Sequence, residues 1–347
     1  MNEKILGRTG LKVKTLGFGG IPIQPLSEED AIKIVRKCYD LGMNYFDTAR
    51  NYSNSEERIG KALEDVREEV YIATKSNKKT SEEVKTEFAT SLKNLMTDYI
   101  DVYQLHNVSN EDQWKQVQAE GGALEAVYEL KEQEKIKHIS VTSHSPDMAV
   151  EMVKSDHFST VLIPYNYLTP KPADELLPLC KKLNVGTIIM KPFGGGAFSN
   201  ANLALKYVYN NPDTDLVIPG VASIAEVEEN WNVWQGDLSI SKEELELIEK
   251  DKKILGDQFC RSCNYCQPCS QEIPISNILR TETQVLRRMG WSEGRVKMVK
   301  AAKEKLDTCI HCGLCESRCP YNLPIQELLP TAMASLWDRM ENQTIPI

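Results

Sequence analysis

Residues 100–105 read Ile-Asp-Val-Tyr-Gln-Leu, a short run rich in Ile, Val, Tyr and Leu without clear polar alternation. A strand that is buried on both faces of a parallel sheet has this composition. Similar runs recur on either side of it, and segments with helical patterns separate them. We therefore expect strands at residues 15–18, 45–48, 70–74, 100–105, 138–142, 161–165, 186–190 and 216–219.

Helix-start signals lie between these runs. Ser27 and Ser81 each stand directly before acidic residues, and we expect both to be N-caps that accept a backbone N–H. Eight strand–helix units between residues 13 and 255 predict a (β/α)8 TIM barrel. The alternative is an open doubly wound sheet, but Gly-Phe-Gly-Gly at 17–20 does not complete its G-x-G-x-x-G signature. Residues 5–13 predict a hairpin ahead of the barrel.

The overall composition excludes some classes of partner. The 347 residues include 41 basic and 50 acidic side chains, and the formal net charge of −9 argues against a nucleic-acid partner. No stretch approaches the roughly 20 apolar residues that span a bilayer, so we expect no membrane segment. The first residues are charged and lack the apolar core of a signal peptide, so the expected location is the cytoplasm.

The cysteines divide the chain. Eight of the ten lie between Cys260 and Cys319, whereas Cys38 and Cys180 lie in helical patterns and are expected to be buried as small hydrophobic residues. In a reducing compartment such a cluster predicts a metal site rather than a disulfide framework. The abrupt change in composition predicts two domains, with the barrel at 1–255 and a cysteine-rich domain at 256–347.

Four reactive side chains follow the ends of three successive predicted strands. Asp47 ends the second strand, and Tyr52 follows in the loop; Lys75 and His106 end the third and fourth strands. Barrel enzymes place their chemistry at this carboxyl end of the strands. Each residue has a plainer interpretation, because Lys75 and Asp47 could form a solvated ion pair and a lone histidine is usually structural. Their coincidence favours an active site.

The stretches that carry these residues resemble the catalytic motifs of the aldo-keto reductases. They are Phe-Asp-Thr-Ala-Arg-Asn-Tyr at 46–52, Ala-Thr-Lys at 73–75 and Asp-Val-Tyr-Gln-Leu-His at 101–106. The similarity continues in the family's order through 164–166, 190–196 and 218–230, and it covers nearly all of the first 250 residues.

The resemblance implies a role for each of the four. Tyr52 would be the general acid that protonates a substrate carbonyl, although a free tyrosine has a pKa of about 10 and needs help near neutrality. Lys75 would stabilise the phenolate, and Asp47 would orient Lys75. His106 would hydrogen-bond the carbonyl oxygen and align it.

A nicotinamide dinucleotide is the cofactor that the resemblance implies. Many NADPH-dependent relatives hold the 2′-phosphate with Lys, Ser and Arg, whereas the matching positions here are Gly220, Val221 and Glu226. An acidic side chain repels a phosphate and accepts from a ribose hydroxyl, which favours NAD(H) over NADP(H). A flavin, or a barrel without nucleotide, remains open. The expected cofactor contacts are Gly19, Thr142, Ser143, Asn166 (at the carboxamide), Lys191, Pro192, Gly220, Glu226, Glu229 and Asn230.

The cysteine-rich part predicts two [4Fe–4S] clusters. Residues 309–320 follow the bacterial-ferredoxin pattern C-x2-C-x2-C-x3-C-P. Residues 260–269 supply a second set of four, with two residues before the last cysteine and no Pro directly after it. Zinc is the alternative metal, but it needs only four ligands and does not call for this triple spacing.

By analogy with dicluster ferredoxins, the ligands would be shared between the two runs in a crossed arrangement. One cluster would take Cys260, Cys263, Cys266 and Cys319, and the other Cys309, Cys312, Cys315 and Cys269. His311 is expected at the surface rather than as a ligand. Helical patterns at 277–288 and 292–305 make this a largely helical, ferredoxin-like domain.

We therefore expect an oxidoreductase that transfers hydride between a nicotinamide and a small carbonyl or alcohol, coupled to electron transfer through two clusters. A ferredoxin or another redox protein is the expected partner. The alternative is an electron-transfer or redox-sensing protein whose barrel is a scaffold. A third possibility is an enzyme in which the clusters are only structural.

Overall fold

The computed structural model describes residues 3–198, 200–256, 258–262, 266–286, 290–319 and 321–345. The chain forms two compact units, one comprising Met1–Phe193 with Asn200–Ile240 and the other Gly194–Ser199 with Ser241–Ile347. Helix α10 (Lys242–Leu255) therefore groups with the cysteine-rich residues, and the units divide earlier than the composition change near residue 255.

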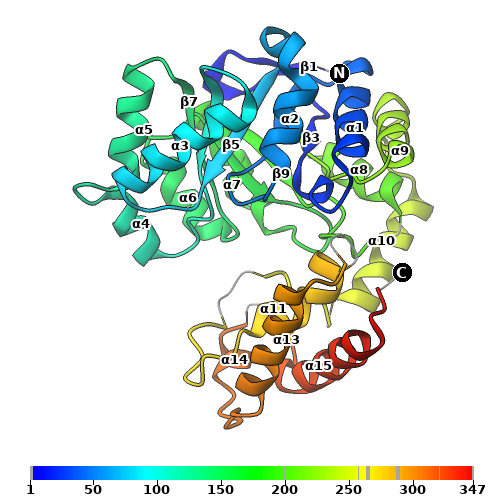
Figure 1. Cartoon of the computed structure of the whole chain (residues 1–347). Coiled ribbons are helices and arrows are strands. Elements are labelled where there is room, and N and C mark those ends of the chain that lie inside the picture. The colour runs from blue at the N-terminus through cyan, green and yellow to red at the C-terminus, as the bar shows by residue number, and fades with distance from the viewer. Residues whose placement is uncertain are drawn as a thin grey trace. The chain divides into compact units, whose positions relative to one another are not determined.

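The first unit contains an eight-stranded parallel sheet in which each strand pairs with the next along the chain (Figure 1). Backbone hydrogen bonds from Gly17 N to Val217 O (2.9 Å) and from Gly19 N to Pro219 O (3.0 Å) join the first strand to the last. The predicted (β/α)8 barrel is confirmed. The strands are β3 (Phe18–Gly19), β4 (Tyr45–Asp47), β5 (Tyr71–Ser76), β6 (Ile100–Leu105), β7 (Ile136–Thr142), β8 (Thr160–Pro164), β9 (Gly186–Met190) and β10 (Leu216–Val217).

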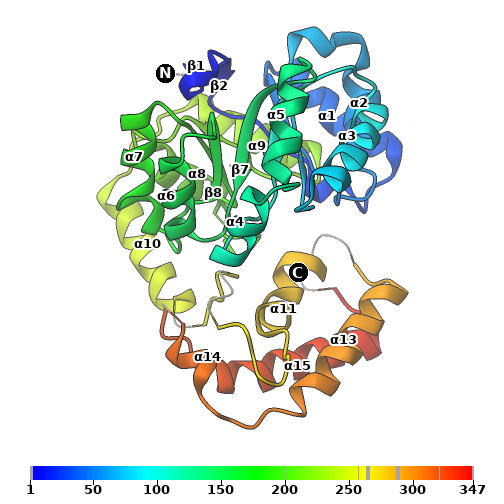
Figure 2. The ribbon, with the colours of Figure 1, turned by 90° about the vertical axis from the view of Figure 1, so that its left-hand side faces the viewer.

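Helices lie outside these strands in both views (Figures 1 and 2). Apolar side chains of the strands and helices form one large core between the two layers, and a smaller core fills the barrel interior. The helices are α1 (Glu28–Asp40), α2 (Ser55–Leu63), α3 (Ser81–Leu95), α4 (Glu111–Gln118), α5 (Ala123–Glu132), α6 (Pro146–Lys154), α7 (Leu176–Leu183), α8 (Ala201–Tyr209) and α9 (Ile224–Gln235).

A hairpin precedes the barrel, as predicted. Strands β1 (Glu3–Ile5) and β2 (Lys12–Lys14) pair antiparallel. Leu6, between them, is fully buried in the interior core. A Cβ on Gly186, at the start of β9, would come within 2.8 Å of the Leu6 side chain, so this close approach requires glycine.

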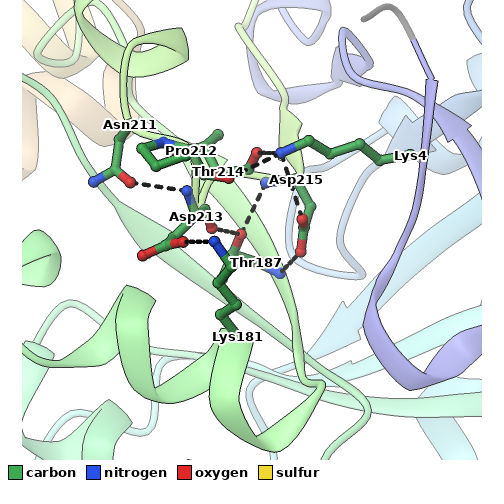
Figure 3. A network of polar contacts seen from close by, with 8 residues as sticks. All are labelled: Lys4, Lys181, Thr187, Asn211, Pro212, Asp213, Thr214 and Asp215. Carbon is green, nitrogen blue, oxygen red and sulfur yellow. Dashed lines mark hydrogen bonds and ion pairs between the residues drawn. The ribbon is translucent and has the colours of Figure 1, made fainter.

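Polar contacts tie this amino-terminal end of the barrel together (Figure 3). The Thr187 hydroxyl donates to Asp213 O at 2.7 Å and accepts from Asp215 N at 2.9 Å. Lys4 donates to the backbone oxygens of Pro212 (3.1 Å) and Thr214 (2.5 Å). The hairpin is thereby fastened to the segment that leads into β10.

The helix starts follow the expected chemistry with one correction. Ser27 accepts the N–H of Asp30 at 3.1 Å and caps α1, as predicted. Ser81 is wrong as an N-cap, because it is the first residue of α3 and Thr80 occupies the cap position. The reason is a β-bridge between Thr80 and Gly122, which holds residue 80 in an extended conformation.

The second unit is helical, and its described residues contain no strand. Helices α11 and α13 pack against α15 around a core that includes Ile278, Val299, Leu329 and Met333 (Figure 1). The helix predicted at 277–288 is instead a short α-helix followed by a π-helix, and residues 287 and 288 lie outside the described part. The elements after α10 are α11 (Ile275–Arg280), the π-helix η5 (Thr281–Leu286), α13 (Glu293–Leu306), α14 (Leu314–Ser317) and α15 (Ile325–Asn342).

Within the described ranges, no helix has both the length and the hydropathy that a transmembrane helix requires.

Candidate functional site

The structure brings the four residues predicted for catalysis together at the carboxyl end of the barrel. Asp47 is the last residue of β4, Lys75 lies near the end of β5, and His106 directly follows β6. The Lys75 ammonium donates to Asp47 Oδ1 at 2.5 Å and to Thr48 O at 2.6 Å. Both members of this pair are buried, so the interaction is not a solvated surface ion pair.

Tyr52 lies in the loop between β4 and α2, directly beside this pair. The Lys75 Nζ atom is 5.0 Å from the centroid of the Tyr52 ring. The Tyr52 and His106 ring centroids are 6.0 Å apart, with an interplanar angle of 81°. A phenol, an ammonium and an imidazole therefore face one another, as proton transfer to a carbonyl held between them requires.

Burial and the neighbouring charges shift the pKa values of Asp47, Lys75 and Tyr52. Burial raises the pKa of Asp47, against the opposing effect of Lys75. Burial alone would lower the pKa of Lys75, but Asp47 and Tyr52 outweigh it and the net pKa of Lys75 is raised. Burial also raises the pKa of Tyr52, while the Lys75 charge opposes this shift. Tyr52 is consequently protonated at neutral pH and lies beside the Lys75 cation.

Two histidines at this end of the barrel are held neutral. Burial, with help from the charges of Lys75 and Lys79, lowers the pKa of His106 to about 3. Burial and the charge of Lys191 lower the pKa of His144 well below its usual value. The Nδ1 atoms of both rings are buried without a hydrogen-bond partner among the described residues. Unsatisfied buried polar atoms are costly, so these two fit a place that a polar ligand fills.

Sequence reasoning missed three residues that hold the site, and Gln104 is the first. Its amide donates to Asp47 Oδ2 at 2.6 Å from within strand β6. Asp47 thus accepts from Gln104 on one oxygen and from Lys75 on the other, which fixes the carboxylate. The available signal was an amide side chain within a buried strand, two residues before His106.

Glu56 and Arg50 are the other two, and they anchor the loop that carries Tyr52. Glu56 is fully buried in α2 and forms an ion pair with Arg50. Its carboxylate also accepts from the Thr74 hydroxyl at 2.7 Å and the Asn94 amide at 3.1 Å. The Arg50 N–H donates to Lys75 O at 2.9 Å. No sequence pattern distinguishes Glu56 from its exposed neighbour Glu57, because only the fold buries it.

The predicted cofactor contacts that follow β7 are already engaged in local hydrogen bonds. The Thr142 hydroxyl accepts from Asn107 N at 2.7 Å, and Ser143 Oγ accepts from Ser145 N at 3.0 Å. Both side chains are buried. They shape the loops after β6 and β7, and whether they also touch a cofactor stays a prediction.

Asn166 and Lys191 are brought together at the ends of β8 and β9. The Asn166 amide donates to Lys191 O at 3.0 Å, and its oxygen accepts from Leu168 N at 2.9 Å. Lys191 has a φ of 55°, which is unusual for a residue with a side chain. Asn166 therefore stabilises the left-handed turn at Lys191, next to the buried Pro192.

The remaining predicted contacts differ in their surroundings. A Cβ on Gly19 would lie 2.9 Å from Ile218 O, and Gly19 forms a β-bridge with Gly220, so strand packing accounts for both glycines. Glu226 accepts from Ala222 N at 2.6 Å at the start of α9. Glu229 is exposed, whereas Asn230 is buried with an Nδ2 atom that lacks a partner among the described residues.

None of the described cysteines forms a disulfide. Cys38 and Cys180 are buried, as predicted, and burial raises the pKa of each to about 12. Cys263 and Pro320 lie outside the described residues. No three Cys, His, Asp or Glu side chains among those described converge on a site for a single metal ion.

The structure describes seven cysteines of the second unit. Six of them belong to its hydrophobic cluster, and the seventh, Cys312, lines a cavity. One small cavity is lined by five of them, Cys266, Cys269, Cys309, Cys312 and Cys315. Cys260 and Cys319 both belong to the hydrophobic cluster of the second unit. Soft thiolates distributed around an apolar cavity suit an iron–sulfur cluster, whose ligands occupy separate corners. His311 is exposed, in keeping with a surface position.

Comparison with known protein families and structures gives independent information. The model of the aldo/keto reductase family matches residues 15–203, and that of a 4Fe-4S dicluster domain matches residues 259–324. The L-galactose dehydrogenase of Arabidopsis thaliana is 28% identical over 277 residues, which is 65% of this chain and 86% of that protein.

Solved structures resemble the barrel. The holo form of an aldo-keto reductase from Bacillus halodurans superposes with a TM-score of 0.62 and 26% identity, covering 72% of this chain and 96% of that one. An aldo-keto reductase from Klebsiella pneumoniae, in complex with NADPH, shares the fold with a TM-score of 0.62 and 21% identity, over 72% of this chain and 95% of that one. The family match covers more than half of the 347 residues, and the chain belongs to the aldo/keto reductase family.

Proposed function

We propose that this protein transfers hydride between a nicotinamide and a small carbonyl or alcohol, with Tyr52 as the general acid. One observation carries the proposal most directly. The Lys75 ammonium is buried, bonded to Asp47, and positioned 5.0 Å from the Tyr52 ring centroid. A cation in that position stabilises the negatively charged phenolate, which is the form of Tyr52 after it gives up its proton.

The residues of the site divide the work of carbonyl reduction. A bound reduced nicotinamide supplies the hydride that forms the new C–H bond at the carbonyl carbon. Tyr52 gives its hydroxyl proton to the carbonyl oxygen, so one O–H bond breaks as another forms. Lys75 stabilises the phenolate, and Asp47 with Gln104 holds Lys75 in place. His106 is neutral and can hydrogen-bond the substrate oxygen without competing as an acid.

Side chains with unsatisfied polar atoms support a bound nucleotide. Asn230 on α9 and His144 after β7 each have such an atom, buried and without a partner among the described residues. Asn166 and Lys191 form the adjoining turn. We propose that these residues, with the other predicted contacts, hold the nicotinamide dinucleotide.

We further propose that the preferred cofactor is NADH. The exposed Glu226 carboxylate accepts a hydrogen bond from Ala222 N, and an acidic group at this position opposes a 2′-phosphate. Replacing Glu226 by Arg should raise the affinity for NADPH about tenfold or more relative to NADH, because a guanidinium pairs with phosphate. Dissociation constants for both nucleotides, measured by fluorescence titration, test this. An unchanged ratio of the two dissociation constants would show that Glu226 does not lie near the ribose.

The cysteine-rich unit is proposed to carry two [4Fe–4S] clusters with crossed ligands. Cys269 lines one cavity with Cys309, Cys312 and Cys315, as this pairing requires, although Cys266 of the other proposed set lines the same cavity. Each cluster would carry single electrons to or from a ferredoxin or another redox protein. The described cysteines form no disulfide, which fits a reducing compartment, and we propose the cytoplasm.

Tyr52→Phe tests the catalytic assignment. Removing the hydroxyl should reduce carbonyl turnover at least about a hundredfold, because general acid catalysis contributes at least that much. Binding of the nicotinamide should be retained, since the ring remains. Tyr71→Phe, on strand β5, is a control that removes a tyrosine hydroxyl away from the site. Full turnover by Tyr52→Phe would show that the Tyr52 hydroxyl is not the general acid.

Two further measurements test the clusters and the alternative of a barrel that is only a scaffold. The iron content of the Cys269→Ala protein should fall by about half if Cys269 is a required ligand, and unchanged content would exclude it.

Anaerobic addition of NADH or NADPH should bleach the visible absorbance of the clusters, with dithionite as the control. Bleaching by dithionite alone, together with no carbonyl turnover, would favour an electron-transfer protein.

A further inference from the structure

Lys79 is a half-buried cation at the carboxyl end of the barrel to which the proposed hydride chemistry gives no role. It lies in the loop between β5 and α3, and its ammonium donates to His106 O at 3.0 Å. In the part of the chain that the structure describes, no carboxylate forms an ion pair with it. Burial lowers the pKa of Lys79 to about 8, so the side chain is still mostly charged at neutral pH.

Two carboxylates of α3 that follow Lys79 along the chain are engaged elsewhere. Glu83 pairs with the neighbouring Lys78 at 3.2 Å. Glu87 accepts a hydrogen bond from the Ser76 hydroxyl. An ammonium that is withdrawn from water without a counter-charge is costly, and binding of an anion offsets that cost. The surroundings of Lys79 therefore suit an anionic ligand.

Contacts at both ends of Lys79 fix its position before any ligand binds. Its backbone oxygen accepts from Ala123 N at 2.9 Å, while its ammonium is held by His106 O. His106 N in turn donates to Ser76 O at 2.8 Å, which joins the ends of β5 and β6. A donor that is already held in place loses little conformational freedom when it binds a ligand.

The position of Lys79 separates it from most of the predicted nicotinamide contacts. It lies where the neighbouring strands β5 and β6 end, against the residue predicted to align the substrate carbonyl. Most of the predicted nicotinamide contacts instead follow β8, β9 and β10 or lie on α9. The Nδ1 atom of His106 is also buried without a partner among the described residues, which fits a polar ligand here.

We propose that Lys79 binds a carboxylate of the substrate, so that the barrel reduces aldehydes or ketones that carry an acidic group or oxidises the corresponding hydroxy acids. The inference rests on the proposed hydride transfer and names its substrate class. A single ammonium is a compact point charge and suits a singly charged carboxylate, whereas bidentate guanidinium groups favour phosphate. Lys79 holds the acidic end of the substrate while Tyr52 and His106 act on its carbonyl oxygen.

Lys78 provides a matched control because it is the adjacent lysine in opposite surroundings. It pairs with Glu83, and its side chain is 41% exposed. The probes are matched in the same way. Each of 3- and 4-formylbenzoate has the same ring and aldehyde as its methyl ester and differs from it in charge, and 4-formylphenyl phosphate carries a phosphate in place of the carboxylate.

Steady-state reduction of these aldehydes by the full-length protein, with NADH or NADPH, tests the inference. The wild type should favour at least one formylbenzoate over its ester about tenfold or more in kcat/KM, because hydrogen bonds to charged groups are the strong ones. Lys79→Met should lose this preference without losing turnover of the ester. Lys79→Arg and Lys78→Met should keep it. Calorimetry with benzoate and benzamide, neither of which can react, should show the same loss of preference in Lys79→Met.

The possible outcomes separate this inference from the proposed function. A wild-type protein that reduces no aldehyde, charged or uncharged, would overturn hydride transfer itself. Equal kcat/KM for acid and ester would overturn only the role of Lys79, as would a preference for the phosphate over both carboxylates. Equal losses for acid and ester in Lys79→Met would assign Lys79 to positioning His106 and contradict the inference.

A measurement on the wild type decides the matter if Lys79→Met does not fold. The preference for the acid over the ester should decline as salt is added, because salt screens the attraction between an ammonium and a carboxylate. A preference that stays constant with salt would contradict a charge-based recognition of the substrate.

Discussion

Each end of the barrel has a lysine–aspartate pair, and the two pairs differ in almost every respect. At the amino-terminal end, Lys4 Nζ is 3.8 Å from Asp215, and the side chains are 29% and 23% exposed. At the carboxyl end, Lys75 Nζ is 2.5 Å from Asp47, and the side chains are 1% and 5% exposed. Lys4 mainly satisfies backbone oxygens (Figure 3), whereas Lys75 faces a phenol.

The difference shows how one residue type acquires a structural or a chemical use. A partly exposed pair is screened by water and contributes at most about 1 kcal/mol. A buried pair costs desolvation energy, and its charge then acts strongly on whatever lies beside it. In this barrel the neighbour is Tyr52, and the same burial lowers the pKa of His106 to about 3. The fold therefore has a partly exposed pair at one end and, at the other, the buried pair to which we assign a part in the chemistry.

The largest expected effect comes from breaking the two pairs in parallel. Lys75→Met should lower the free energy of unfolding by about 3–5 kcal/mol, because it leaves the Asp47 carboxylate buried without its counter-charge. It should also abolish carbonyl turnover. Lys4→Met should cost less than about 1 kcal/mol and leave turnover unchanged. Urea unfolding and steady-state kinetics measure both, and equal losses for the two variants would contradict the difference between the ends.

A substitution at Thr187 sharpens the comparison from the structural end. Thr187→Val keeps the shape of the side chain but removes the hydroxyl that bonds Asp213 O and Asp215 N. Leaving these backbone groups unsatisfied should cost about 1–3 kcal/mol of stability. Turnover measured well below the unfolding temperature should stay at the wild-type level. A large drop in kcat without loss of stability would show that this end also affects catalysis.

The pH dependence of stability tests the chemical end. His106 has a folded-state pKa of about 3, below the value of about 6.5 in an unfolded chain. Between these values the unfolded state binds the proton and the folded state does not, so the stabilisation is present above about pH 6.5 and is lost as the pH falls. His106→Gln should reduce the slope by up to about 1.4 kcal/mol per pH unit in this window. Urea unfolding at several pH values measures the slope, and an identical slope in the variant would show that His106 is solvated.

The smallest expected effect concerns the support of Asp47. Gln104→Met removes the amide that bonds Asp47 Oδ2 while keeping the length of the side chain. Because Asp47 remains bonded to Lys75, kcat/KM should fall only about tenfold, which corresponds to one charge-assisted hydrogen bond of about 1.4 kcal/mol. Cofactor affinity should be unchanged. Loss of turnover as complete as in Lys75→Met would make Gln104 an equal partner in the site.

Much of the barrel was predictable because its signals are local. Buried strands such as 100–105 and 186–190 match β6 and β9 in both bounds. Asp47, Lys75 and His106 could be placed together since parallel strands in a barrel end at the same face. The family resemblance supplied Tyr52, which lies in a loop and has no position that strand geometry alone would fix.

The residues that support the site could not be predicted, because their contacts join segments that are not neighbours in the sequence. Glu56 and Arg50 pair only because α2 packs against β5 and α3, and their neighbours in sequence look no different. The N-cap at Thr80 rather than Ser81 depends on a bridge to Gly122, far along the chain. Arg280, on α11, donates to Gly194 O, 86 residues away along the chain. Contacts of this kind are tertiary, and a single sequence carries no trace of them.

Transfer of deuterium is the most direct test of the chemistry assigned to the carboxyl end. The wild-type protein is incubated with a reduced nicotinamide dinucleotide that is deuterated at C4 and with an aromatic aldehyde as the carbonyl probe. The alcohol product is then analysed by mass spectrometry. We expect deuterium on the carbinol carbon with the wild-type protein and at least about a hundredfold less with Tyr52→Phe. Binding of the nicotinamide without any transfer by the wild-type protein, to this and other aldehydes, would contradict hydride transfer at this site.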